Sequence, residues 1–126
     1  MTALNEEAKT KLVNAWIAAQ EAKNHDSWAI VKMGDIPQFE PELGWELILQ
    51  IHAQPLSVGV RGILATSPLE DLLVYHGEAF LPRVKELALR DPVFHKMLES
   101  VWLDDGSPIS EAFQALVGEV STPDED

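Results

Sequence analysis

The chain of 126 residues contains no cysteine, so neither a disulfide nor a cysteine-based zinc site can hold its fold together. No apolar run approaches the roughly 18 residues of a membrane-spanning helix, and the opening stretch MTALNEEAKTKL lacks the apolar core of a signal peptide. A glycine-rich phosphate loop and a G-x-S-x-G nucleophile motif are both missing. We therefore expect a cytoplasmic protein without a membrane segment, stabilised by an apolar core.

Basic residues are few as well. Nine Lys and Arg side chains stand against 21 Asp and Glu side chains, which gives a net charge of -12. Residues 98–126 contain eight of these acids and neither Lys nor Arg. Such a charge repels phosphate backbones, so we expect no binding to nucleic acid, whereas a protein partner with a basic surface would be attracted.

The pattern of apolar residues predicts an all-α fold. A long helix is expected from about Asn5 to Lys23, because Leu12, Val13, Trp16 and Ile17 recur there at helical spacing. Similar stripes follow around Trp28 and after Pro41, Pro92 and Pro108. We predict a single domain over residues 1–120, with about six to eight short helices packed as successive hairpins, either HEAT-like (α-solenoid-like) or as an irregular bundle. An acidic, disordered tail is expected at 121–126.

Two segments fit more than one secondary structure. Residues 45–51, WELILQI, also alternate with the period of a strand, but Pro41 at a helix start favours a helix. Residues 57–65, SVGVRGILA, fit a helix or a strand, and the apolar pattern leaves both alternatives open.

Three helix starts are indicated by a capping residue directly before proline: Ser67-Pro68, Asp91-Pro92 and Ser107-Pro108. Glu70, three residues after Ser67, completes a capping box. Gly77 stands where a left-handed C-terminal cap would end the helix that begins at Pro68. A separate helix is then expected to follow, with Phe80, Val84, Leu87 and Ala88 facing the core.

The segment that contains PLEDLL (68–73), HG (76–77), DPVF (91–94) and VW (101–102) resembles a family of small bacterial proteins of unknown function. The resemblance extends to the upstream helices that contain Trp16, Trp28 and Trp45, so it covers most of the chain. It implies an all-helical fold and no particular activity. His95 departs from the family pattern, which has arginine at this position.

Titratable residues are densest at Glu70, Asp71, His76 and Glu78. In one helix, the two acids of the first turn and the histidine of the last turn would each complement the helix dipole. Glu70 and His76 are six residues apart and therefore face different sides of such a helix. We expect a structural role for these residues, and the alternative is that His76 faces a groove.

Two sets of residues have the spacing of metal ligands. Asp91, His95 and Glu99 follow one another at i, i+4 and i+8, and Glu21 and His25 form an i, i+4 pair. Asp91 is expected to cap its own helix, and a catalytic metal usually takes three protein ligands. We therefore predict no metal and no cofactor.

Four tryptophans are many for this length. Trp16 and Trp102 lie on apolar stripes and are predicted to be in the core, whereas Trp28 and Trp45 fit their stripes less well and are candidates for partner contacts. The sequence favours a non-enzymatic helical protein-interaction module, acting as an accessory protein, an adaptor or an immunity-type inhibitor. The alternative function is a small metal-assisted hydrolase that uses His76 or His95.

Overall fold

Helices account for every regular element in residues 4–104 and 106–121, the parts of the chain that this computed structural model describes. The elements are α1 (Glu6–Ala22), α2 (Trp28–Phe39), α3 (Pro41–His52), α4 (Val58–Leu64), the π-helical turn η1 (Ala65–Leu69), α5 (Glu70–Arg90), α6 (Pro92–Leu98) and α7 (Ser110–Ser121). The all-α single domain is thus confirmed. The tail predicted beyond Ser121 lies outside the described residues.

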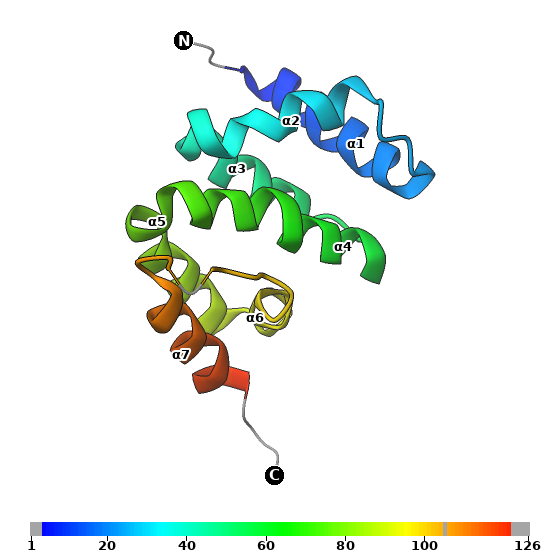
Figure 1. Ribbon diagram of the computed structural model, residues 1–126. Helices are drawn as coiled ribbons and strands as arrows, with labels where there is room; N and C mark the ends of the chain where they lie inside the picture. Colours follow the sequence, from blue (N-terminus) through cyan, green and yellow to red (C-terminus); the bar gives the residue numbers. More distant parts are fainter. Residues whose placement is uncertain (1–3, 105, 122–126) are drawn as a thin grey trace.

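One bent helical run organises these elements (Figure 1). α4, η1 and the first turns of α5 follow one another as a rod, and α1, α2 and α3 lie on one side of it. The longer remainder of α5, after a bend at His76, turns away from the rod and leads to α6 and α7 at the other end of the molecule. Because η1 contacts α2 and α3 as well as its neighbours α4 and α5, the centre of the rod lies in the core.

α1 begins and ends where the sequence predicts. The side-chain oxygen of Asn5 accepts a hydrogen bond of 2.7 Å from the backbone N–H of Ala8, and Lys23 ends the helix with a left-handed φ of 57°. Trp16 is 2% exposed, which confirms its prediction as a core residue. The apolar stripe of α1 therefore packs inward along its length.

The two ambiguous segments are both helical. α3 begins at Pro41 as predicted, and it buries Leu47, Ile48 and Ile51. Residues 58–64 form α4, and the Ser57 hydroxyl caps this helix by accepting a hydrogen bond of 3.1 Å from the N–H of Val60. Ser57 thus starts a helical run that continues through η1 into α5.

The helix start predicted at Ser67 is wrong. Ser67 is an exposed residue inside η1, and the helix passes through it without a break. Pro68 lacks an N–H group and crowds the preceding turn, and the wider π-helical turn accommodates it without ending the helix. The capping box fails too, because the Glu70 carboxylate accepts a hydrogen bond of 2.9 Å from the backbone N–H of Trp102.

The C-terminal cap predicted at Gly77 is also wrong. α5 continues to Arg90, and its helical geometry is interrupted at His76, where φ is -137° and ψ is 32°. Gly77 has no positive φ and serves close packing instead. A Cβ atom at this position would lie 2.6 Å from Cδ1 of Ile109 and 3.0 Å from its Cγ1. The missing side chain therefore lets the segment before α7 pack directly on the bend of α5.

α6 is shorter than the apolar stripe suggests. Asp91 caps it as expected, accepting hydrogen bonds of 3.0 and 3.1 Å from the N–H groups of Val93 and Phe94. The helix ends at Leu98, so Trp102 lies in the following loop. Trp102 is 68% exposed, and its prediction as a core residue is wrong because the helical spacing does not extend to it.

The third predicted cap, Ser107, acts in the turn before α7 rather than at its first residue. Its hydroxyl accepts a hydrogen bond of 3.4 Å from the N–H of Ile109, and the helix itself begins at Ser110. Ile109, Phe113 and Leu116 are buried, as the apolar stripe after Pro108 predicts.

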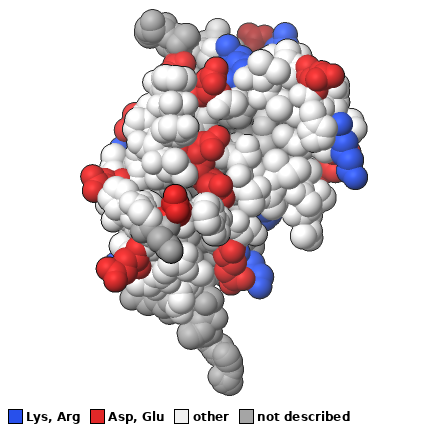
Figure 2. Space-filling view, viewed as in Figure 1, with Lys and Arg blue, Asp and Glu red and all other residues white. Residues whose placement is uncertain are grey.

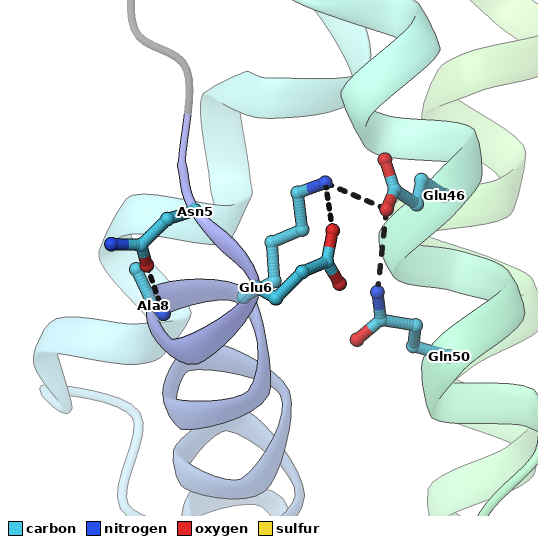
Figure 3. Close-up of polar contacts among 6 residues, drawn as sticks. Asn5, Glu6, Ala8, Glu46 and Gln50 are labelled. Atoms are coloured by element: carbon cyan, nitrogen blue, oxygen red, sulfur yellow. Dashed lines mark hydrogen bonds and ion pairs between the residues drawn. The ribbon is translucent and has the colours of Figure 1, made fainter.

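A polar cluster joins α1 to α3 (Figure 3). The Lys9 ammonium group lies 2.7 Å from a carboxylate oxygen of Glu46 and 3.1 Å from one of Glu6, and Gln50 approaches the same Glu46 oxygen at 3.5 Å. The hydrogen bonds that Lys9 donates to Glu46 and Glu6 raise the pKa of Lys9. The only half-buried lysine among the described residues is therefore paired with two acids.

Acidic side chains are spread over the face shown in Figure 2, with Lys and Arg side chains lying beside acids near its upper and lower ends. In the described part of the chain, no helix is long and apolar enough to cross a membrane. On the face shown in Figure 2, acidic side chains predominate over basic ones.

The two tryptophans predicted to be in the core provide a matched test of packing. Trp16→Ala should lower the free energy of unfolding by about 3–5 kcal/mol, because it leaves a cavity in the core. Trp102→Ala should lower it by less than about 1 kcal/mol, because the ring is largely exposed. Urea denaturation of both variants measures the difference, and equal losses would contradict the described position of Trp102.

The helix start can be located in the same way. Ser57→Ala should cost about 1 kcal/mol, because it removes the side-chain cap of α4. Ser67→Ala should change the free energy of unfolding by no more than about 0.5 kcal/mol, because Ser67 caps no helix. Thermal or urea unfolding of the pair decides between the two starts, and a larger loss at Ser67 would restore the one indicated by the sequence.

Candidate functional site

A groove of about 510 Å³ lies between α4 and α6. Its apolar walls come from the loop before α4, from α4 itself and from α6, through Leu56, Val58, Pro92, Val93 and Met97. Arg61, Lys96 and Glu99 add charged groups to the lining. The groove thus combines an apolar surface with cationic side chains, in a protein whose net charge is -12.

Both walls of the groove expose valine. Val58 on α4 is 91% exposed and Val93 on α6 is 51% exposed. Helix capping places both residues, since Ser57 and Asp91 fix the first turns of their helices. The exposed apolar surface of both side chains is available to a ligand.

A chain of hydrogen bonds supports the polar side of the groove. Nη1 of Arg61 lies 2.7 Å from Nδ1 of His52, and Nε2 of His52 lies 3.0 Å from Oδ2 of Asp91. Because a guanidinium group can only donate, Nδ1 accepts, and the hydrogen on Nε2 is donated to the carboxylate. The last residue of α3 therefore connects α4 to the start of α6.

Asp91 accepts a hydrogen bond from His52 and also caps its own helix, α6. Partial burial opposes ionisation of its carboxyl group. Hydrogen bonds from His52 and from the backbone N–H groups of Phe94 and Val93 outweigh that effect, and they lower the pKa of Asp91 below the ordinary aspartate value. The His52 ring also packs edge-on against Phe94, with ring centroids 5.4 Å apart.

Lys96 on α6 and Glu99, which directly follows α6, both line the groove and are paired with each other. Nζ of Lys96 lies 3.4 Å from a carboxylate oxygen of Glu99. Arg61 is half-buried, and no carboxylate of the described residues forms an ion pair with it. Among the cationic side chains of the groove, Arg61 is therefore the one without an ion pair to a described carboxylate.

The tryptophans predicted to contact a partner differ in their surroundings. Trp28, at the start of α2, is 51% exposed, and the ammonium group of Lys11 lies 6.0 Å from its ring centroid. Trp45 is half-buried and packs against the rings of Phe80 and Phe94, at 6.2 and 6.3 Å. Neither tryptophan lines the groove between α4 and α6.

The histidines of the alternative, hydrolytic prediction both bind backbone. Nε2 of His76 lies 2.6 Å from the carbonyl oxygen of Gln38, and His95 is 5% exposed with its Nε2 at 3.2 Å from the carbonyl oxygen of Val117. Within residues 4–104 and 106–121, no three His, Asp or Glu side chains are arranged to hold a metal ion. The spacing of Asp91, His95 and Glu99 thus brings no such group together here.

Sequence reasoning missed both His52 and Arg61. Arg61 lies in the segment whose secondary structure the apolar pattern leaves open, and His52 lies at the very end of α3. The available indication was Ser57 after Pro55, a capping residue that starts a helix and thereby places Arg61 on it.

The chain belongs to a family of unknown function, DUF6869, whose model matches residues 17–115. No curated protein and no solved structure matches the chain. The expected resemblance to an uncharacterised family is thus confirmed. The matched range contains both walls of the groove. It also contains the three hydrogen-bonded residues Arg61, His52 and Asp91.

Substitution of Asp91 should separate its two roles. Asp91→Ala should cost about 1–2 kcal/mol at neutral pH, because α6 loses its cap. Asp91→Asn keeps one oxygen for the cap but loses both the charge and the oxygen that accepts from Nε2 of His52, so its cost reports the contact with His52 without the cap. Urea denaturation of the three proteins measures both differences.

The pH dependence of the same variants tests the charge. Because the pKa of Asp91 is lowered in the folded protein, the carboxylate stabilises the fold above the ordinary aspartate pKa, and this contribution is lost as the pH falls through the lowered value. The difference between wild type and Asp91→Asn should therefore shrink as the pH falls below about 4. A difference that stays constant down to about pH 2 would show that the charge contributes nothing to stability.

Proposed function

We propose that this protein is a non-enzymatic helical module that binds another protein through the groove between α4 and α6. The observation that carries the proposal is the exposed apolar surface on both walls of the groove, with Val58 at 91% and Val93 at 51% exposure. Apolar side chains gathered beside polar ones at a concave surface are typical of sites that bind a partner chain.

The construction of the groove supports the proposal. Its walls are the two short helices α4 and α6, and the hydrogen bonds through His52 connect them. A preformed groove costs little conformational entropy when a partner binds. A volume of about 510 Å³ has room for several side chains of a helix or an extended segment.

The acidic surface adds a second element to the proposed function. A net charge of -12 raises the association rate of a partner with a basic surface and keeps other acidic proteins away. Trp28, exposed at the start of α2, is a further candidate for contact with such a partner. Accessory protein, adaptor and immunity-type inhibitor are the roles that a module of this kind would serve.

Charged substitutions on the walls test the proposal. The partner is first captured from an extract of the native host, identified and purified, and its affinity is then measured by calorimetry. The double variant Val58→Glu and Val93→Glu should bind at least about tenfold more weakly, because a carboxylate would be buried on each wall.

Val74→Glu provides the matched control. Val74 is 54% exposed on α5 and does not line the groove, so its substitution should leave the affinity within about threefold of wild type. Circular dichroism confirms that each variant is folded. If the groove variant binds normally whereas Trp28→Ala does not, the partner binds at α2 and the proposal for the groove is wrong.

A further inference from the structure

Two of the described lysine and arginine side chains, those of Lys9 and Arg61, are half-buried, and they differ in their hydrogen-bond partners. Lys9 is held by the carboxylates of Glu6 and Glu46. Arg61 has hydrogen bonds only to His52, through Nδ1 of the ring at 2.7 Å and the backbone carbonyl at 3.5 Å. A partly desolvated guanidinium group without a counter-ion lowers the stability of the fold. The protein has 21 acidic side chains, yet none of the described ones forms an ion pair with Arg61.

Asp91 does not act as that counter-ion directly. The imidazole ring of His52 lies between it and Arg61, and the carboxylate already accepts hydrogen bonds from His52, Val93 and Phe94. The effect of Asp91 on Arg61 is to orient it, because it fixes the His52 ring whose Nδ1 accepts from the guanidinium group. Arg61 is thus positioned at the groove with N–H groups left over for a ligand.

The charge and shape of the groove define what this ligand is. Lys96 is paired with Glu99, so Arg61 provides a single uncompensated positive charge, which one carboxylate would neutralise. The surrounding surface is apolar, and Val58 at its edge is 91% exposed. An open apolar groove of this kind suits a polypeptide segment better than a small ligand, which is usually enclosed.

We propose that Arg61 binds a carboxylate of the partner protein, and that the segment lying in the groove is therefore an apolar peptide with one acidic group beside its apolar residues. The inference rests on the proposed function of the groove and specifies its ligand. The carboxylate can belong to an Asp or Glu side chain or to the C-terminus of the partner chain, and both would form the same charge-assisted hydrogen bonds with a guanidinium group.

A synthetic peptide array tests this inference without changing the protein. Each apolar peptide is made with Glu, Gln or Lys at its centre, and each version is made with a free and an amidated C-terminus. The full-length protein should bind carboxylate-containing peptides about ten- to hundredfold more tightly than their uncharged counterparts. Preference for Glu over Gln identifies a side-chain carboxylate, and preference for the free C-terminus over the amide identifies the terminal one.

The variant Arg61→Gln should lose this preference and bind acidic and uncharged peptides equally. Arg90→Gln is the matched control, since it makes the same change of charge at an exposed arginine outside the groove and should keep the preference. Circular dichroism and a thermal melt show whether both variants are folded. The comparison of Glu and Gln peptides on the unmodified protein remains decisive if Arg61→Gln does not fold.

The results separate this inference from the proposed function. If the unmodified protein binds Glu and Gln peptides equally and binding depends on Val58 and Val93, the groove binds apolar peptides and the role of Arg61 is wrong. A preference for Lys peptides overturns the inference as well. If no peptide of the array binds, both the inference and the proposal for the groove as a peptide site are contradicted.

Discussion

The bend of α5 at His76 determines how the two ends of the molecule face each other. The backbone leaves helical geometry there, and the imidazole Nε2 donates a hydrogen bond of 2.6 Å to the carbonyl of Gln38 near the end of α2. Gly77 then lets Ile109 approach closely, which places the segment that leads into α7. α4 precedes the bend and α6 follows α5, so the two walls of the groove come from the two sides of the bend in the chain.

Charged side chains affect the stability of this fold differently when they are exposed and when they are partly buried. The ion pair of Arg83 and Glu42 has two hydrogen bonds of 2.8 and 2.9 Å but is largely exposed, so it contributes little to stability. Asp71 is less exposed, and burial together with the nearby charge of Glu70 raises its pKa. Because the raised value favours the protonated form in the folded state, the ionised carboxylate opposes folding at neutral pH.

The sequence predicts the helical class, most helix starts and much of the core, because these depend on local patterns. Asn5, Pro41 and Asp91 begin helices where their chemistry indicates, and Trp16 lies on a stripe that is buried. The predictions at Ser67 and Gly77 are wrong because tertiary packing holds one helical run through proline and glycine. The candidate site could not be predicted from the sequence for the same reason, since His52, Arg61 and Asp91 come together only in the folded chain.

The local contacts of Arg61 explain the orientation of its side chain, whereas its charge is explained only by the proposed ligand. Its hydrogen bond to His52 accounts for its orientation, but not for the presence of a charge. For stability alone, an apolar side chain of similar length would serve this half-buried position better, because it needs no counter-ion. On our proposal, a partner that supplied the missing carboxylate would turn this cost into binding free energy, since the guanidinium group is already partly desolvated and oriented.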